Sequence, residues 1–191
     1  ARAVKQVLGQ CILTKGIKID KLSTFDIEYL FLNVRGKSVG ETVDIKVTCP
    51  DDGVTTVPVT VDLDAIKVTF DPEHDKDIIL DDKLKMRMKY PSLDEFIKEN
   101  FQVDNVGFEQ SIEMIATCVD MIYSEEETWT SADFTQKEMI DFLEGLGSKQ
   151  FKELEKFFTT MPKLTHEIKV KNPKTKKENT IKLEGLAAFF N

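Results

Sequence analysis

The apolar positions at the start of the chain fall at helical spacing. Residues 3–13 carry an apolar side chain every three or four positions, which predicts an amphipathic helix. Ser23 or Thr24 can cap a second helix that runs to about Arg35. Apolar residues surround this second helix on nearly all sides, so we expect it to be buried, and Gly36 should mark its end.

Between this helix and residue 90, apolar side chains recur at every second position. Residues 43–48 and 57–61 alternate between apolar and polar side chains on either side of a turn, which predicts a β-hairpin. Short strands are expected at residues 68–70 and 77–80. Residues 84–90 alternate apolar with basic side chains, which predicts a strand with one face in water.

The second half of the chain returns to helical spacing. A helix is expected at residues 92–100. Apolar residues at intervals of four, three, four and three predict another helix over residues 108–122. A capping box that begins at Thr135 opens a third helix. Ser148 can cap a fourth, and Pro162 closes it.

Two more strands, at residues 167–171 and 179–183, complete the predicted order of elements. The pattern therefore predicts an α+β fold with a helical core and small antiparallel β-hairpins. We expect a single domain, or two lobes that meet near residue 90. In that division residues 1–90 hold helices, a β-hairpin and strands, and residues 91–191 are mainly helical with a C-terminal β-hairpin.

The two hairpins share a weak sequence repeat. Residues 44–50 resemble residues 167–173, and each segment is followed by a polar turn and a second strand. Such a pair arises by chance from β-propensity and turn chemistry, or it reflects two zinc-ribbon knuckles. Tetrahedral zinc needs four ligands, usually from two Cys-x-x-Cys pairs. Only Cys49 stands at such a position. Asp52 occupies the place of its Cys-x-x-Cys partner, and Asn172 occupies the place of the equivalent cysteine in the second hairpin. We therefore expect degenerate zinc-ribbon-like knuckles without metal, held by packing alone.

Composition limits the function classes. The 191 residues include 34 acidic and 26 basic side chains, and the net charge of −8 argues against a nucleic-acid-binding protein. The apolar runs are far shorter than the roughly 20 residues that span a bilayer, so we expect no membrane association. Cys11, Cys49 and Cys118 are widely spaced, which fits free thiols in a reducing compartment. The sequence begins without methionine, so residues should precede Ala1.

Charge is distributed unevenly along the chain. Residues 109–144 contain ten acidic residues and one lysine, whereas residues 165–182 contain six lysines and two glutamates. One interpretation is that both segments are ordinary solvated faces. The other is that they give the molecule an acidic end and a basic end that dock against neighbours in an assembly.

The sequence contains no catalytic or cofactor-binding motif. His74 lies in an acidic stretch that predicts an exposed turn, and His166 precedes a strand, so neither forms a nucleophile–base pair. Glycine-rich phosphate-binding loops are also missing from the sequence. We therefore expect no enzyme activity, no cofactor, no metal and no small-molecule ligand.

Short motifs near the end of the chain are the most specific part of the sequence. They are Phe157-Phe158, Met161-Pro162-Lys163-Leu164, Leu183-Glu184-Gly185-Leu186 and Phe189-Phe190, with Tyr29-Leu30-Phe31-Leu32, Cys49-Pro50 and Tyr90-Pro91-Ser92 upstream. Together they resemble the baseplate hub protein family of T-even-like contractile-tailed bacteriophages. This chain departs from that family by lacking most of the hairpin cysteines, which removes any implied zinc knuckle.

The resemblance implies a structural or assembly component of the tail baseplate hub that acts through protein–protein contacts. The alternative is a transient assembly chaperone for hub proteins, absent from the mature virion. The implied partners are other phage baseplate or hub proteins. The implied location is the tail baseplate of the virion, after assembly in the cytoplasm of the host bacterium.

Apolar residues near the end of the chain are the candidates for partner binding. Two adjacent phenylalanines near a chain end are unfavourable in water, so they should dock on another apolar surface. Either they close the helical core against the Phe157 face, or they present an anchor to a neighbouring hub protein. The candidate partner-binding residues are Phe157, Phe158, Met161, Pro162, Leu164, Phe189 and Phe190.

Overall fold

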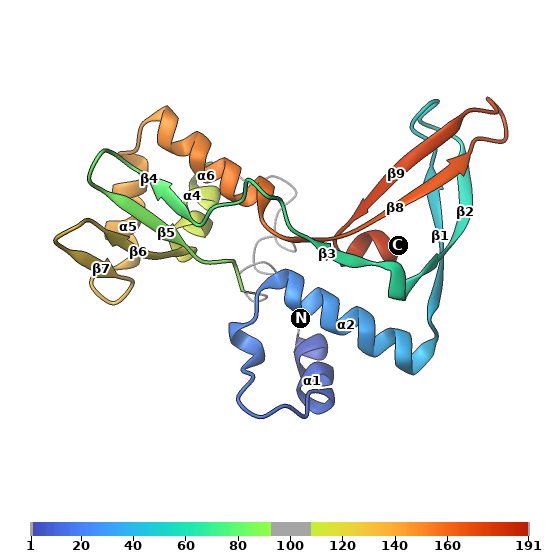
Figure 1. The fold of residues 1–191 in the computed structure, drawn as a ribbon, viewed down its shortest axis with the longest axis horizontal. Coiled ribbons are helices and arrows are strands. Elements are labelled where there is room, and N and C mark those ends of the chain that lie inside the picture. Colours follow the sequence, from blue (N-terminus) through green and yellow to red (C-terminus); the bar gives the residue numbers. More distant parts are fainter. Residues whose placement is uncertain (1, 93–107, 191) are drawn as a thin grey trace. The chain divides into compact units, whose positions relative to one another are not determined.

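The computed structural model describes residues 2–92 and 108–190, and the chain passes back and forth between two units (Figure 1). Unit 1 contains Asp20–Thr24 and Phe70–Met161. Unit 2 contains Arg2–Ile19, Phe25–Thr69 and Pro162–Asn191. Each unit is therefore assembled from separate stretches of sequence. The expected organisation as one domain, or as two lobes that meet near residue 90, stays a prediction.

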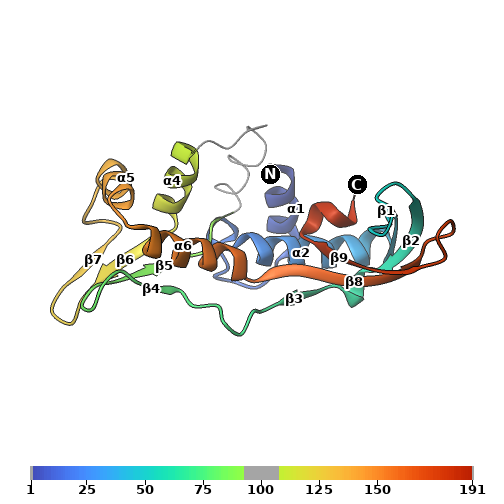
Figure 2. The same ribbon diagram turned by 90° about the horizontal axis from the view of Figure 1, so that it is seen from above.

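A four-stranded antiparallel sheet is the base of unit 1. Its strands follow the order β4 (Asp77–Ile79), β5 (Lys85–Met88), β6 (Val119–Tyr123) and β7 (Thr128–Thr130). Within the described residues, the α-helices of this unit are α4 (Phe108–Thr117), α5 (Gln136–Glu144) and α6 (Ser148–Thr160), and Figure 2 shows them on the same side of the sheet. Apolar residues of the sheet and of these helices form one core, as expected for a sheet with one face covered.

Unit 2 combines helices with two separate hairpins. It contains helix α1 (Arg2–Cys11) and, from Phe25 on, helix α2 (Thr24–Val39), whereas the 3₁₀ helix between them (Ile19–Lys21) has Asp20 and Lys21 in unit 1. Strands β1 (Thr42–Thr48) and β2 (Thr56–Asp62) form a two-stranded sheet, and β3 (Lys67–Thr69), β8 (Lys163–Lys171) and β9 (Glu178–Glu184) form a three-stranded one. Two further 3₁₀ helices lie at Leu63–Ala65 and Leu186–Phe189. Inward-facing residues of both hairpins pack together with Leu32 of α2 in a second core.

Several predicted elements are confirmed. Both hairpins form, and β5 exposes Lys85 and Arg87 while it buries Met86 and Met88. The capping box at Thr135 makes both of its hydrogen bonds. The cap of α6 is different from the prediction, because Gly147 precedes the helix and Ser148 is its first residue.

The prediction of one helix over residues 108–122 is wrong in its second half. Helix α4 ends at Thr117, and residues 119–123 form strand β6. Val119 and Ile122 fit helical spacing, but both are β-branched residues that also favour strands. Strand β6 pairs with β5 on one side and with β7 on the other, and this pairing outweighs the local pattern.

Gly36 does not end the second helix, which continues to Val39. The glycine is buried, and a Cβ atom added there would lie 3.7 Å from Leu63 Cδ1, an ordinary van der Waals distance. Gly40, with a φ of 148°, follows the helix instead and turns the chain towards β1.

The predicted helical core with small hairpins is also wrong. The described residues contain three antiparallel sheets, and strand residues contribute a large part of both cores. The fold is still α+β, but the sheets are principal elements of both units. The helix expected at residues 92–100 lies, from residue 93 on, outside the described residues.

Candidate functional site

The seven residues predicted to bind a partner are divided between the two units. Phe157, Phe158 and Met161 belong to unit 1, and Pro162, Leu164, Phe189 and Phe190 belong to unit 2. Four of them are buried, namely Phe157, Pro162, Leu164 and Phe189. Phe158 and Met161 are half-buried, and Phe190 is 38% exposed. Contact of these residues with a partner stays a prediction.

The two phenylalanines near the chain end have different environments. Phe189 is fully buried in the core of unit 2, whereas Phe157 belongs to the core of unit 1. Phe190 lies at the surface of unit 2, with its ring centroid 6.4 Å from that of Phe31 in an edge-to-face arrangement. The guanidinium carbon of Arg35 lies 5.4 Å from the Phe190 centroid. Phe189 is therefore a core residue, and Phe190 keeps part of its ring accessible.

His74 does not lie in an exposed turn as predicted. It is half-buried in unit 1, and its ring stacks on that of Tyr90 at 5.6 Å between centroids. Its Nδ1 lies 2.9 Å from Thr160 Oγ1, and its Nε2 lies 3.0 Å from the Tyr90 hydroxyl. Thr160 donates its own proton to the Lys156 carbonyl, so it accepts from Nδ1–H, and Nε2 accepts from Tyr90. Both ring nitrogens are therefore satisfied by packing partners rather than by a nucleophile.

Polar side chains join the tips of the two hairpins in unit 2. The Asn172 side-chain amide donates to the carboxylates of Asp51 at 2.8 Å and Asp52 at 3.0 Å. The Thr175 hydroxyl also donates to Asp51, and the Asp51 backbone N–H donates to Asn179 Oδ1 at 3.1 Å. The expectation that packing alone holds these hairpins is therefore wrong. We call this set of hydrogen bonds the tip network.

The tip network also decides the ionisation of the groups around it. Hydrogen bonds from the side chain and backbone of Thr55 hold the pKa of Asp52 well below its usual range. Cys49 is buried at the start of this turn, and burial, followed by the charges of Asp51 and Asp52, raises the pKa of its thiol. A buried protonated thiol is a poor nucleophile and a poor metal ligand. Among residues 2–92 and 108–190, no group of three or more metal-ligating side chains comes together.

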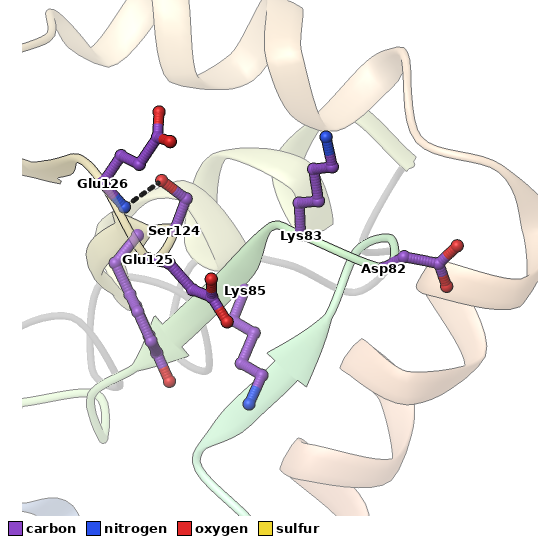
Figure 3. Close-up of a pocket in the computed structure, with 7 residues that line it drawn as sticks. Asp82, Lys83, Lys85, Ser124, Glu125 and Glu126 are labelled. Atoms are coloured by element: carbon purple, nitrogen blue, oxygen red, sulfur yellow. Dashed lines mark hydrogen bonds between the residues drawn. The ribbon is translucent and has the colours of Figure 1, made fainter.

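A charged depression of about 480 Å³ lies on unit 1 between the β4–β5 turn and the β6–β7 turn. Figure 3 shows the residues around it, which include Asp82, Lys83, Lys85, Ser124, Glu125 and Glu126. The Ser124 hydroxyl oxygen accepts hydrogen bonds from the backbone N–H groups of Glu126 at 3.2 Å and Glu127 at 3.0 Å. Ser124 therefore shapes its turn. No histidine or cysteine stands among the residues that line this depression.

A second hollow in unit 1 is almost entirely apolar. It measures about 310 Å³ and is lined by Leu84, Ile122, Trp129, Phe134, Glu138, Met139 and Phe142. We call it the apolar groove. Aromatic residues provide much of its wall, and such side chains are enriched where proteins bind one another.

The strand register explains why the apolar groove exists. Ile78, Met86, Ile122 and Trp129 lie opposite one another on β4, β5, β6 and β7. The first three are buried, but Trp129, on the edge strand β7, is 39% exposed. Sequence reasoning missed this residue because it missed β7. The strand-favouring triplet Thr128-Trp129-Thr130 was the available signal.

Carboxylates cluster in the segments that form the apolar groove. Glu138 lines it, while Asp133 and Asp141 adjoin Phe134 and Phe142 in sequence. All three carboxylates are exposed, and within the described part of the chain no lysine or arginine forms an ion pair with them. Hydrogen bonds from Thr135 lower the pKa of Glu138, and those from Thr130 lower that of Asp133, so both stay ionised at neutral pH.

The basic segment lies in unit 2, on the β8–β9 hairpin. Its exposed lysines are Lys169, Lys171, Lys174, Lys176, Lys177 and Lys182. The uneven charge of the sequence thus corresponds to an acidic surface on unit 1 and a basic hairpin on unit 2.

Residues 1–191 match the family described as T4 bacteriophage base plate protein, and the chain belongs to this family. It is a structural or assembly component of a phage tail baseplate, where other baseplate proteins are its partners. No curated protein and no solved structure matches it. None of the helices in the described ranges has both the length and the apolar character that crossing a bilayer requires.

Proposed function

We propose that this protein acts at the baseplate hub, as a structural or assembly component that works through protein–protein contacts. The observation that carries the proposal is the apolar groove, in which Trp129 and neighbouring aromatic side chains face solvent on a surface rich in carboxylates. An exposed apolar surface of this kind gains free energy when a partner covers it. Half-buried Phe158 and Met161 and exposed Phe190 are further candidate contacts.

The protein performs this role without catalysis and without binding nucleic acid. No histidine or cysteine lines the charged depression, and the net charge of −8 opposes contact with phosphate backbones. Cys11, Cys49 and Cys118 are free thiols, which supports assembly in the reducing cytoplasm of the host.

Quantitative mass spectrometry of purified virions, and of hub precursors purified from infected cells, tests the proposal. A hub component should be present in both samples, in a fixed ratio to the other hub proteins. Recovery from the precursors alone would instead establish a transient assembly chaperone. Cross-linking of this chain only to peripheral baseplate proteins would contradict its place at the hub.

A further inference from the structure

We propose that the apolar groove of unit 1 receives the hairpin tip of a second copy of this chain, so that copies join head to tail. This inference rests on the proposed function, because it names the partner of one docking surface. The tip consists of Val54 in the β1–β2 turn and Lys174, Lys176 and Lys177 in the β8–β9 turn. We call these four residues the basic tip.

The groove offers an incomplete apolar site. Ile122 and Met139 are buried at its base, while Trp129 is 39% exposed at its edge. An apolar side chain placed there would lose its contact with water and cover Trp129 at the same time. Tryptophan in such a position is a common source of binding free energy in protein interfaces.

The basic tip presents a suitable side chain. Val54 is 74% exposed, and its backbone N–H donates to Asp52 Oδ1 at 3.1 Å. Asp52 also accepts from Asn172 at 3.0 Å, so the tip network places the Val54 turn beside the turn that carries the lysines. An apolar side chain therefore stands next to several exposed ammonium groups on one tip. Because the tip network holds both turns together, little conformational entropy remains to be lost on binding.

The charges of the two surfaces favour contact of groove against tip over contact between two grooves or between two tips. The groove is formed by segments rich in ionised carboxylates, such as Asp133 and Glu138. The tip carries Lys174, Lys176 and Lys177 beside the carboxylates of Asp51 and Asp52, so lysines outnumber carboxylates there by three to two. A contact of groove against groove would place like charges together, as would a contact of tip against tip. Of these contacts, groove against tip brings unlike charges together. Where each copy offers its groove to one neighbour and its tip to another, the contact is heterologous and propagates into a ring or an open chain.

Sedimentation velocity of the purified protein, over a range of concentrations, tests the inference. At about 0.05 M salt the protein should associate, and at about 0.5 M salt it should become monomeric because the charges are screened. Trp129→Ala, Val54→Asp and the triple variant Lys174→Glu/Lys176→Glu/Lys177→Glu should each raise the dissociation constant by at least about tenfold. The control Lys15→Glu/Lys18→Glu/Lys21→Glu changes the net charge equally and should associate as the wild type does. Circular dichroism of each variant verifies its fold.

A mixing experiment distinguishes this geometry from a symmetric dimer. Trp129→Ala keeps an intact tip, and Val54→Asp keeps an intact groove. Each variant alone should be monomeric, but an equal mixture should form dimers that grow no further. A wild type that stays monomeric at low salt, or a mixture that stays monomeric, overturns the inference.

The failure of this inference differs from the failure of the proposed function. If the wild type is monomeric but Trp129→Ala still blocks baseplate assembly, the groove binds a different baseplate protein, and only the second copy is wrong. The hub proposal itself fails on the mass spectrometry and cross-linking described above, whatever the oligomeric state.

Discussion

At the scale of single residues, neighbouring positions in this protein have different structural roles. Phe189 fills the core of unit 2, while Phe190 lies over Phe31 at the surface. His74 carries a titratable ring in a packed aromatic environment where a neutral side chain is preferred. The burial of Phe189 affects the stability of the isolated protein, and the burial of His74 affects how that stability depends on pH.

Replacing Phe189 by alanine should lower the stability of the isolated protein by about 3–5 kcal/mol, because a fully buried ring is lost. Replacing Phe190 should cost only about 1 kcal/mol, from its contacts with Phe31 and Arg35. Thermal unfolding measures both. If Phe190 contacts a partner, Phe190→Ala should impair baseplate assembly while the melting temperature changes little. Equal losses of stability in the two variants would contradict this assignment.

Stability should depend on the ionisation of His74. Burial, followed by the charge of Lys76, lowers the pKa of His74 from 6.5, whereas Asp71 and Asp75 act in the opposite direction. The folded protein therefore binds the proton more weakly than the unfolded chain does. The contribution of His74 is complete above pH 6.5 and is lost as the pH falls through the folded pKa.

Melting temperatures between about pH 8 and about pH 5 provide the measurement. The melting temperature of the His74→Gln variant should fall less steeply with decreasing pH than that of the wild type. Parallel curves for the wild type and His74→Gln would show that His74 does not titrate in this way.

At the scale of elements, local sequence signals and tertiary pairing decide different features. The hairpins and the capping box at Thr135 follow from alternation and from residues a few positions apart, so the sequence predicts them well. Strand β6 depends on partners in β5 and β7, and its apolar spacing fits a helix equally well. Local periodicity therefore could not distinguish the two.

The candidate sites were less predictable for the same reason. Asn172 reaches Asp51 and Asp52 across a long separation in sequence, so no local pattern reveals the tip network. The exposure of Trp129 depends on how far the helices extend over the sheet, which periodicity does not report. In contrast, the segregation of charge was visible in the sequence, because each charged surface comes mainly from one continuous stretch.

Gly36 and Gly40 give a matched pair of tests for the end of α2. Gly36→Ala should stabilise the protein by about 0.5–1 kcal/mol, because alanine favours a helix interior and the added methyl group would contact Leu63 at an ordinary distance. Gly40→Ala should destabilise it by about 1–3 kcal/mol, because a φ of 148° is unfavourable for residues with a Cβ atom. Thermal unfolding measures the stability of both variants. If Gly40→Ala were more stable than Gly36→Ala, the helix boundary would be contradicted.

At the scale of the whole molecule, positive and negative side chains are segregated, which the net charge alone does not show. The β8–β9 hairpin carries exposed lysines, but acidic residues predominate elsewhere, and the net charge is −8. A macromolecular partner therefore encounters surfaces of opposite sign on the two units. This favours selective docking over general attraction to polyanions.

Duplex DNA should accordingly not bind at about 0.15 M salt, because the acidic remainder of the protein repels phosphates that the lysine hairpin could contact. Fluorescence anisotropy with a labelled duplex measures this directly. A dissociation constant in the usual nonspecific range, about 10⁻⁴ to 10⁻⁶ M, would contradict the prediction.

The alternation of the chain between its two units has a consequence for protein synthesis. Every stretch of unit 1 precedes β8 and β9 in the chain, so unit 1 emerges from the ribosomal exit tunnel while β8 and β9 are still inside it. Translation at about 5–20 residues per second leaves a short interval in which unit 1 can fold first. During that interval, the apolar faces of β1 and β2 lack the partners Leu164, Ile168 and Leu183 that later share their core. A released chain that ended at residue 161 would therefore contain every stretch of unit 1 but lack the strands that complete the core of unit 2.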